Sequence, residues 1–409
     1  MDNVYATLKE RGFVSQVTDA EALEALLGKE RVTCYIGFDA TAPSLHAGSL
    51  LPLMALAHMQ RAGHRPVAIL GGGTTMVGDP SGKTEMRKML TEEQIGEFGE
   101  KLRVQIGRFI DLDGDRGMMI NNAEWLLPLQ YIPFLRDIGR HFSVNRMLSH
   151  ESYKIRLEKG LSFLEFNYQL LQAYDFLVLF QKHGCVLQMG GDDQWGNIVA
   201  GMDLIRRIEG KPAYGLTFPL LETAGGEKMG KTAAGAVWLD AERTSPYEFF
   251  QYFRNTDDRD VERFLAFFTF LPMEEVRRLG KLKDAELNRA KETLAFEATK
   301  IVHGESAAES ALKGAKSAFT GAGEGAEDIP TTGIPASRLN EGILVVDLLA
   351  EVGLCKSKSE ARRLVQQGGA RLGEKKVAGI DEKVTSDDLS DGMVLLRAGK
   401  KKVHRIKAD

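Results

Sequence analysis

Short apolar strands that end at or next to a glycine alternate with helical segments between Val32 and Asp240. Strands that alternate with helices are typical of a doubly wound parallel sheet with helices on both faces. In such a fold, ligands bind beyond the carboxyl ends of the strands. The sequence therefore predicts an α/β fold with a site at that edge of the sheet. The predicted segments, in chain order, are the strand Arg31–Phe38, the helix Leu50–Gly63, the strand Arg65–Gly71, the helix Leu164–His183 and the strand Cys185–Gly191.

The rest of the chain follows two other patterns. From Ser245 to about Lys316, amphipathic periodicity indicates packed helices without strands. A stretch rich in glycine, alanine, threonine and proline then reads as a linker, and two helices and short strands with glycine-rich turns follow it. A chain of 409 residues is expected to form two or three domains. We predict an α/β domain at 1–242, a helical domain at 243–320, a linker at 321–341 and a small α+β domain at 342–409.

Composition excludes several classes of protein. Hydrophobic residues make up 43% of the chain and charged residues 27%, as in soluble globular proteins. No stretch reaches the roughly 18–20 apolar residues that a membrane span needs, and residues 1–30 lack the apolar core of a signal peptide. Cys34, Cys185 and Cys355 stand far apart and form no Cys-x-x-Cys motif. We therefore expect a cytoplasmic protein with reduced cysteines, no metal site and no membrane contact.

Charge is unevenly distributed along the chain. The whole chain carries a net charge of −4, whereas the segment from Gly342 to the end has 14 Lys or Arg residues against 10 Asp or Glu residues. Such asymmetry indicates that the C-terminal domain binds an acidic partner. A solvated helix face is the ordinary interpretation of its basic helix, but the cluster Lys400–Lys402 favours contact with phosphates. The basic residues that begin this helix are Lys356, Lys358, Arg362 and Arg363.

Two segments far apart in the sequence carry the strongest chemical signal. Residues 35–49 read as a strand, a turn and the start of a helix, with His46 and Gly48 where the helix begins. A helix N-terminus offers unpaired N–H groups and a positive dipole end, which suit a phosphate. Lys228 and Lys231 lie on a loop rich in glycine and alanine, where they can meet charge that develops on a leaving group. Together the two segments predict an enzyme that activates a substrate with ATP.

A polar stripe interrupts the apolar helix that precedes the third strand. Tyr168, Gln172 and Asp175 are spaced so that they share one helix face. This face either meets solvent or lines a polar pocket. Asp192, Asp193 and Gln194 follow the third strand and favour the pocket, because a ligand of this fold lies at strand ends.

The segment 78–84 resembles a phosphate-binding P-loop, but it departs from that motif. A P-loop requires a glycine where this chain has Val77, so a Walker-type NTPase is excluded. Lys83 and Arg87 either reach a phosphate from this loop or remain solvated.

These motifs, in this order, resemble the bacterial tyrosyl-tRNA synthetases over essentially the whole chain. The resemblance implies a Rossmann-like catalytic domain, an all-helical anticodon-binding domain and an α+β RNA-binding domain. It also implies the two ATP-holding signatures of class I synthetases, HIGH at His46–Ser49 and KMSKS at Lys228–Thr232. The matching segments are YIGFDATAPSLHAGS, GHRPVAILGG, GDPSGK, LLQAYDF, LQMGGDDQWGNI, KMGKT and, similar to a domain of a ribosomal small-subunit protein, SKSEARRLVQQGG.

The resemblance implies a reaction in two steps. The carboxylate of L-tyrosine attacks the α-phosphate of ATP to give tyrosyl-adenylate and pyrophosphate, and a terminal adenosine hydroxyl of tRNA(Tyr) then attacks the adenylate. A carboxylate is ionised at neutral pH, so the first step needs positioning and charge stabilisation rather than a general base. The catalytic residues implied are Thr41, His46, Lys83, Arg87, Lys228, Lys231 and Thr232. The ATP-binding residues implied are Gly37, Asp39, His46, Gly48, Ser49, Gly191, Asp193 and Lys231.

The resemblance also implies how the amino acid is chosen. Tyr35 and Asp175 would hydrogen-bond the phenol, which can donate to a carboxylate and accept from another hydroxyl. The sequence departs from the family pattern at Ser49, which replaces the second histidine of HIGH, and at Gly230 and Thr232, which leave both lysines in place. The rest of the implied tyrosine site is Asp79, Tyr168 and Gln172 around the ammonium, with Gln194 nearby.

The partners implied are tRNA(Tyr), L-tyrosine, ATP with Mg²⁺ and a second copy of the chain, with no tightly bound cofactor. Three alternatives stay open. A tryptophanyl-tRNA synthetase has a similar fold, but Tyr35 and the C-terminal domain weigh against it. A nucleotidyltransferase of the same superfamily would not need the helical domain or the basic tail. A non-catalytic RNA-binding protein on a synthetase scaffold predicts loss of motif residues, whereas His46, Lys228 and Asp175 are intact.

Overall fold

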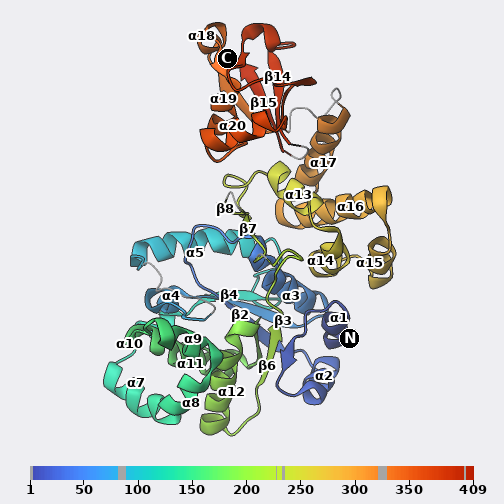
Figure 1. Ribbon diagram of the computed structural model, residues 1–409. Coiled ribbons are helices and arrows are strands. Elements are labelled where there is room, and N and C mark those ends of the chain that lie inside the picture. Colours follow the sequence, from blue (N-terminus) through green and yellow to red (C-terminus); the bar gives the residue numbers. More distant parts are fainter. Residues whose placement is uncertain (1–2, 82–88, 227, 233–234, 321–328, 400–401) are drawn as a thin grey trace. The chain divides into compact units, whose positions relative to one another are not determined.

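The computed structural model describes residues 3–81, 89–226, 228–232, 235–320, 329–399 and 402–409, without the side chains of 151–152, 231–232 and 318–320 (Figure 1). The chain forms two compact units. The first comprises Met1–Lys231, Ala236–Asp240 and Arg259–Lys281, and the second comprises Thr232–Gly235, Ala241–Asp258 and Leu282–Asp409.

A six-stranded sheet forms the centre of the first unit, in the order β1-β6-β5-β2-β3-β4. Strands β2 to β6 are parallel to their neighbours, and only the short edge strand β1 runs antiparallel, along β6. The chain fills one side of β2 with β3 and β4 and then the other side with β5 and β6. The doubly wound sheet is thus confirmed, and its switch point lies between β2 and β5, where such folds bind ligands. The strands are β1 Gln16–Val17, β2 Thr33–Phe38, β3 Arg65–Leu70, β4 Met118–Asn121, β5 Cys185–Gly191 and β6 Tyr214–Phe218.

Helices cover both faces of this sheet, with α3 and α5 on one side and α11 and α12 on the other (Figure 1). The predicted helix Leu164–His183 is divided into α10 and α11, because a capping box between Ser162 and Glu165 starts a separate short helix. The helices are α1 Val4–Glu10, α2 Ala20–Lys29, α3 Leu50–Arg61, α4 Gly72–Val77, α5 Glu92–Ile106, α6 Ala123–Leu126, α7 Tyr131–Asp137, α8 Val144–Ser149, α9 Glu151–Lys159, α10 Phe163–Phe166, α11 Tyr168–His183, α12 Trp195–Glu209, α14 Val261–Phe268 and α15 Met273–Gly280.

Helices α14 and α15 belong to the first unit, although the sequence placed them in a helical domain that begins at 243. The Arg11 guanidinium donates to the carbonyls of Ala266 and Thr269 at 2.8 and 3.0 Å, which caps the end of α14. The Phe13 ring packs against Phe267 with a centroid distance of 5.3 Å. These contacts join residues that are distant in sequence, so no local pattern reveals them.

The second unit contains three packed helices and a small sheet domain. Helix α13 (Pro246–Arg254) packs on α16 (Asp284–His303) and α17 (Glu305–Thr320), and these two pack on each other. The small domain has its own apolar core and a sheet in the order β12-β11-β14-β15-β9. Its elements are β9 Thr331–Ile334, α18 Ala336–Glu341, β10 Ile343–Leu344, α19 Val345–Glu351, α20 Lys358–Gln366, β11 Ala370–Leu372, β12 Lys375–Lys376, β13 Lys383–Val384, β14 Met393–Ala398 and β15 Lys402–Ala408.

Part of the predicted linker 321–341 is ordered structure. Residues 321–328 lie outside the described part of the chain, but β9 pairs in parallel with β15, and α18 follows it. Ile334 and Leu339 are 1% and 0% exposed in the core of the small domain. The prolines and glycines of this stretch suggested a linker, and its isolated apolar residues were too few to form a recognisable period.

Replacement of Leu339 by alanine is therefore expected to destabilise the small domain. Removing a fully buried leucine side chain lowers the free energy of unfolding by about 2–5 kcal/mol. Hydrogen exchange at the amides of β14 and β15 measures the effect, and Asn340→Ala, at an exposed neighbouring position, is the control. Unchanged protection in Leu339→Ala would mean that this stretch is a linker after all.

Candidate functional site

The two chemical motifs of the sequence meet at the start of helix α3. His46 caps the 3-10 turn Ala47–Ser49, and its Nδ1 accepts a hydrogen bond from the Gly48 N–H at 3.0 Å. The Ala47 N–H donates to the Val237 carbonyl at 2.8 Å, and the Val237 N–H donates to the Gly230 carbonyl at 2.9 Å. The lysine loop is therefore held against the helix start by backbone hydrogen bonds.

Glycine is required where the two segments touch. Gly230 has φ of +80°, and a Cβ atom there would lie 2.5 Å from the Gly48 nitrogen. A Cβ atom on Gly48 would lie 2.9 Å from the Met229 carbonyl oxygen. The KMSKS-like loop of this chain carries glycine at 230 because its backbone approaches the helix start so closely.

Several predicted phosphate-binding residues can be placed only in part. The Lys228 side chain is exposed, and Lys231 and Thr232 form strand β7, with side chains outside the described part of the structure. Lys83 and Arg87 also lie outside the described residues. Ser49 precedes α3 without a side-chain cap bond, and Thr41 is exposed just beyond β2.

A buried carboxylate lies on α11, which covers the other face of the sheet from α3 (Figure 1). Asp175 of α11 is 4% exposed, and its two oxygens accept hydrogen bonds from Asn122 Nδ2 at 2.9 Å and Trp125 Nε1 at 2.7 Å. Burial raises the pKa of Asp175 to about 7, although both hydrogen bonds act to lower it. Repulsion from Asp39 raises the pKa further. The carboxyl is thus poised between its two protonation states near neutral pH.

Tyr35 of β2 lies beside this carboxylate. Its ring packs on Phe176 with a centroid distance of 5.3 Å, and the side chain is 1% exposed. Among the residues that the structure describes, the Tyr35 hydroxyl has no hydrogen-bond partner. Burial, with Asp175 adding to it, raises the pKa of Tyr35 well above its ordinary value, so the phenol stays protonated. A buried hydroxyl without a hydrogen bond costs about 1–3 kcal/mol. The Tyr35 hydroxyl is therefore a candidate for a hydrogen bond to a ligand.

The polar stripe of α11 is largely buried against other polar residues. Tyr168 is 6% exposed, and its hydroxyl donates to Asp39 Oδ2 at 3.2 Å. Asp39 Oδ1 also accepts from Thr74 Oγ1 at 2.9 Å. Gln172 is half-buried, and its Oε1 accepts from Asn197 Nδ2 at 3.0 Å. The hydrogen bonds tie α11 to the end of β2 and to α12, which favours the pocket interpretation over a solvated face.

Asp79 and Gln194 join the same group of polar residues. Asp79 is 8% exposed, and its carboxylate accepts from the Ser81 N–H at 2.9 Å and from Gln194 Nε2 at 2.8 Å. Gln194 Oε1 in turn accepts from Asn197 at 3.3 Å. Burial raises the pKa of the nearby Asp193, repulsion from Asp79 adds to the effect, and the positive charge of Lys228 opposes it. The lysine loop and the end of β5 thus act on one another electrostatically.

Glycines leave room at the strand ends. Gly37 is exposed within β2, and no heavy atom of the described residues would lie within 4 Å of a Cβ there. A Cβ atom on Gly191 would lie 2.6 Å from Asp193 Oδ1, and one on Gly71 would lie 2.1 Å from Asp39 Oδ1. Backbone and carboxylates therefore sit close together here, and an open surface remains beside β2.

Sequence reasoning missed the residues that hold Asp175 in place. Asn122 and Trp125 follow β4, a short strand that the sequence did not reveal because Met118–Asn121 is only partly buried. Asn122 is fully buried and also donates to Thr74 Oγ1 at 3.0 Å. The available signal was the Asn121-Asn122 pair directly after an apolar run, at a strand end like those of β2 and β5.

The basic residues of the small domain separate into two groups. Lys356 and Arg363 line a cavity of about 590 Å³ together with Lys402. Lys358 forms an ion pair with Asp347 at 2.9 Å, and Arg362 is exposed without lining that cavity. The helix α20 that carries them starts at Ser357, whose side chain accepts from the Glu360 N–H.

The described part of the chain offers neither a metal-binding cluster nor a membrane span. Within it, no three His, Cys, Asp or Glu side chains gather in a way that could hold a metal ion. No helix there is long and apolar enough to span a membrane. Cys34, Cys185 and Cys355 are all buried and unpaired with one another.

Comparison with known proteins assigns the family. Residues 28–320 match the family of class I tRNA synthetases for tryptophan and tyrosine (tRNA synthetases class I, W and Y), and residues 323–406 match the tyrosine–tRNA ligase SYY-like C-terminal domain. The chain is 56% identical to the tyrosine–tRNA ligase of Desulfatibacillum aliphaticivorans over 99% of this chain and 98% of that one. It is also 56% identical to that of Caldanaerobacter subterraneus, over 99% of both chains.

Solved structures agree with this assignment. A C-terminally truncated mitochondrial tyrosyl-tRNA synthetase of Aspergillus nidulans is 32% identical, with a TM-score of 0.69 over 78% of this chain and 95% of that chain. A tryptophanyl-tRNA synthetase of Encephalitozoon cuniculi shares the fold at 15% identity, with a TM-score of 0.57 over 76% of this chain and 89% of that chain. Full-length relatives and the C-terminal domain favour tyrosine over tryptophan. The chain therefore belongs to the tyrosine–tRNA ligases, a family of class I aminoacyl-tRNA ligases.

Proposed function

We propose that this member of the tyrosine–tRNA ligase family activates L-tyrosine with ATP in the cytoplasm and transfers the tyrosyl group to tRNA(Tyr). The observation that carries the substrate assignment is the buried Tyr35 hydroxyl, unpaired among the described residues, beside the Asp175 carboxylate. A substrate phenol placed between them donates a hydrogen bond to the Asp175 carboxylate and accepts one from the Tyr35 hydroxyl. Asn122 and Trp125 keep Asp175 oriented for this contact.

The ammonium group of the substrate binds at the acidic end of the pocket. Asp79 supplies the carboxylate, and Tyr168 and Gln172 supply oxygens from the α11 stripe. Gln194 orients Asp79 through a 2.8 Å hydrogen bond. The neighbouring carboxylates Asp39 and Asp193 give this end a negative potential that favours a cation.

ATP binds where the two motifs meet. The helix start at Gly48 and Ser49 binds the phosphates together with His46 and Lys228. In this proposal Lys83, Arg87 and Lys231 supply further positive charge, and Thr41 and Thr232 supply hydroxyl groups. The adenosine lies along Gly37, Asp39, Gly191 and Asp193, where glycines leave the backbone accessible. Mg²⁺ arrives bound to the ATP phosphates, as is usual for this ion, and no tightly bound cofactor is required.

Positioning and electrostatics carry the chemistry. The tyrosine carboxylate forms a bond to the α-phosphorus in line with the bond to pyrophosphate, which breaks and leaves its electron pair on the leaving oxygen. No proton moves in this step. His46 and the lysines stabilise the charge that develops on the leaving group. The terminal adenosine hydroxyl of the tRNA then attacks the tyrosyl carbonyl carbon, and AMP leaves.

The tRNA is held by parts of the chain beyond the α/β domain. The helical segment 243–320, whose helices α13, α16 and α17 lie in the second unit, contacts the anticodon region. Lys356, Lys358, Arg362 and Arg363 contact phosphates. Phosphate contacts fix the position of the RNA, while contacts to bases carry its identity.

A second copy of the chain covers an apolar surface of the first unit. We take the exposed apolar side chains of residues 127–164 as this partner surface, because exposed apolar side chains that gather in one region mark an interaction site. We propose a homodimer through it. The residues and their exposed fractions are Leu127 53%, Tyr131 59%, Ile132 69%, Val144 56%, Ile155 43%, Leu157 55%, Phe163 70% and Leu164 40%.

Exchange of label between pyrophosphate and ATP tests the activity. We expect exchange with tyrosine and none with tryptophan or phenylalanine. A site built to pair a hydroxyl rejects the analogue without it by about 10⁴–10⁵, and the upper value is one measured for tyrosyl-tRNA synthetases themselves. Exchange with tryptophan would overturn the substrate assignment. If no amino acid supported exchange, the non-catalytic RNA-binding protein would become the better interpretation.

Tyr35→Phe separates ligand binding from folding. Removal of the hydroxyl should raise the KM for tyrosine by up to about tenfold, because one neutral hydrogen bond to the phenol is lost. The free protein should be as stable as the parent or more stable by about 1 kcal/mol, because an unpaired buried hydroxyl disappears. Exchange kinetics and thermal denaturation without ligand provide the two measurements. A less stable variant would show that the hydroxyl already has a partner in the free protein.

The raised pKa of Asp175, about 7, predicts a pH dependence. An ionised carboxylate accepts the phenol's hydrogen bond best, so the KM for tyrosine should fall as pH rises from about 6 to 8. The folded pKa lies above the unfolded one, so the contribution of Asp175 to stability is lost as pH rises through about 7. Asp175→Asn should abolish both trends and lower kcat/KM by about 100-fold. A KM that does not vary with pH in the parent contradicts this assignment of the titrating group.

Phe163→Asp should dissociate the dimer, because a charge at a buried contact is costly. Sedimentation velocity of the parent and the variant measures the mass in solution. Val104→Asp, at a 64% exposed position on α5, is the matched control and should remain dimeric. If the unsubstituted protein sediments as a monomer, the proposed homodimer is wrong.

A further inference from the structure

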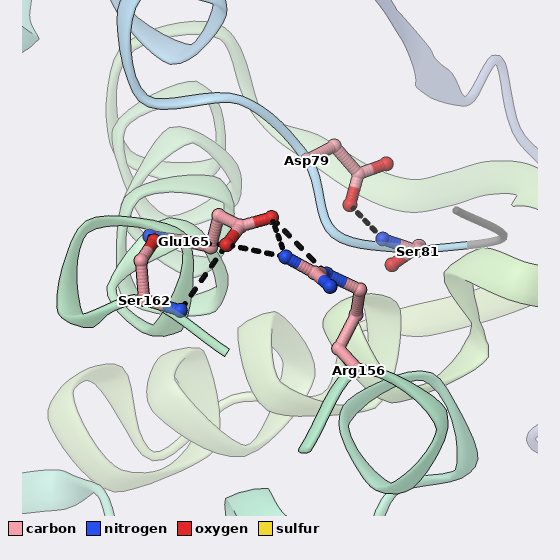
Figure 2. A network of polar contacts seen from close by, with 5 residues as sticks. All are labelled: Asp79, Ser81, Arg156, Ser162 and Glu165. Carbon is pink, nitrogen blue, oxygen red and sulfur yellow. Dashed lines mark hydrogen bonds and ion pairs between the residues drawn. The ribbon is translucent and has the colours of Figure 1, made fainter. Parts of the chain in front are cut away.

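A buried ion pair lies next to the turn that carries Asp79 (Figure 2). Arg156 of α9 and Glu165 of α10 are both 3% exposed. Arg156 Nη2 contacts both carboxylate oxygens at 2.9 Å, and its Nε donates to Oε1 at 3.2 Å. Glu165 Oε2 also accepts from the Ser162 N–H at 3.2 Å and the Ser162 hydroxyl at 2.8 Å. The carboxylate is therefore fully occupied and fixed in one orientation.

Stability alone is a poor explanation for such a pair. Removing two charges from water costs several kcal/mol each, and an apolar pair of similar size is often as stable. Burial raises the pKa of Glu165, but the hydrogen bonds from Ser162 and Arg156 outweigh it, so that the pKa lies below its ordinary value. The pair thus remains ionised, and the carboxylate holds the guanidinium in one orientation.

On the side away from Glu165, Arg156 faces the Asp79–Ser81 turn (Figure 2), and Asp79 is part of the proposed tyrosine site. Figure 2 shows the guanidinium between the Glu165 carboxylate and the Asp79–Ser81 turn. The Tyr153 phenol supports this proximity: burial raises its pKa, and both Asp79 and Glu165 contribute to the increase, so both carboxylates lie near one side chain. Asp79 itself accepts the Ser81 N–H, which closes the turn, and the turn is buried.

Asp79 lies in an acidic part of the site. It is 8% exposed, and its charge raises the pKa of Asp193 across the site. A guanidinium held in one orientation beside the turn limits the conformations that the backbone of the turn can adopt.

We propose that Arg156, oriented by Glu165, is a positioning residue that holds the Asp79 turn in the conformation that binds the substrate ammonium. The inference rests on the proposed function, because it assumes that Asp79 binds that group. Arg156 acts through Asp79 and does not touch the substrate. Its loss should therefore affect the binding of tyrosine and leave the ATP side of the site intact.

Pyrophosphate exchange by the full chain, without tRNA, tests the proposal. Arg156→Met should raise the KM for tyrosine about tenfold, because the Asp79 turn loses its support, with the KM for ATP and kcat within about twofold of the parent. Glu165→Gln, which keeps the size of the side chain, should show the same selective effect if Arg156→Met does not fold. Arg338→Met, which removes an arginine paired with Glu351 at 2.8 Å in the small domain, is the control and should leave all three constants unchanged.

A charge-swapped double variant separates positioning from mere structural support. Arg156→Glu with Glu165→Arg retains an ion pair but puts the negative charge beside Asp79. Positioning predicts that thermal stability recovers while the KM for tyrosine stays at least about tenfold above the parent value. If the swap restores both, or if Arg156→Met and Glu165→Gln raise both substrate constants equally or neither, the proposal is overturned.

Asp79→Asn shows whether the positioning role of Arg156 is wrong or the proposed ammonium site at Asp79 is wrong. If Asp79→Asn raises the KM for tyrosine and the Arg156 and Glu165 variants do not, only the positioning role is lost. If Asp79→Asn has no effect on that KM, the assignment of the ammonium site itself is wrong.

Discussion

The parallel pairing of β2 between β3 and β5 is the constraint on which the rest of the structure depends. It aligns Tyr35 with Val67 on one neighbour and with Gln188 on the other, and it brings the carboxyl ends of all three strands to one edge. Asp39 and Asp193 follow the ends of β2 and β5, and Asp79 follows α4, the helix after β3, so the three carboxylates come from different parts of the sequence to one place. A parallel sheet needs crossover helices, and α11 is the helix that returns the chain to β5 with its polar stripe toward the same edge.

Crowding of carboxylates sets the electrostatics of this edge. Asp175 and Asp193 both have raised pKa values, because burial and neighbouring acids disfavour their ionised forms. Oriented donors from Asn122 and Trp125 hold the Asp175 carboxyl in place. In the proposed site the amino-acid end is acidic and the phosphate end is basic. Such separation of charge suits a zwitterion whose carboxylate faces a triphosphate.

The places of several candidate site residues in the fold could be predicted from the sequence, because their motifs are local. The spacing of Tyr168, Gln172 and Asp175 on one helix face and the position of His46 at a helix start follow from helix geometry alone. The donors to Asp175 could not be predicted this way, since β4 is short and Asn122 acts through contacts with two distant segments. The strand and helix within 329–341 were missed for a related reason, as β9 is defined by pairing with β15 at the far end of the chain.

By itself, the sequence determined the alternation of strands and helices, the chemical identity of the groups at the strand ends and the basic character of the C-terminal domain, because periodicity and composition are properties of neighbouring residues. Only the tertiary structure decided which of those groups meet. It buried most of the α11 stripe, left the Tyr35 hydroxyl without a partner among the described residues, and placed Arg156 and Glu165 beside the Asp79 turn (Figure 2). Each of these depends on burial and on contacts between distant segments, which no local pattern encodes.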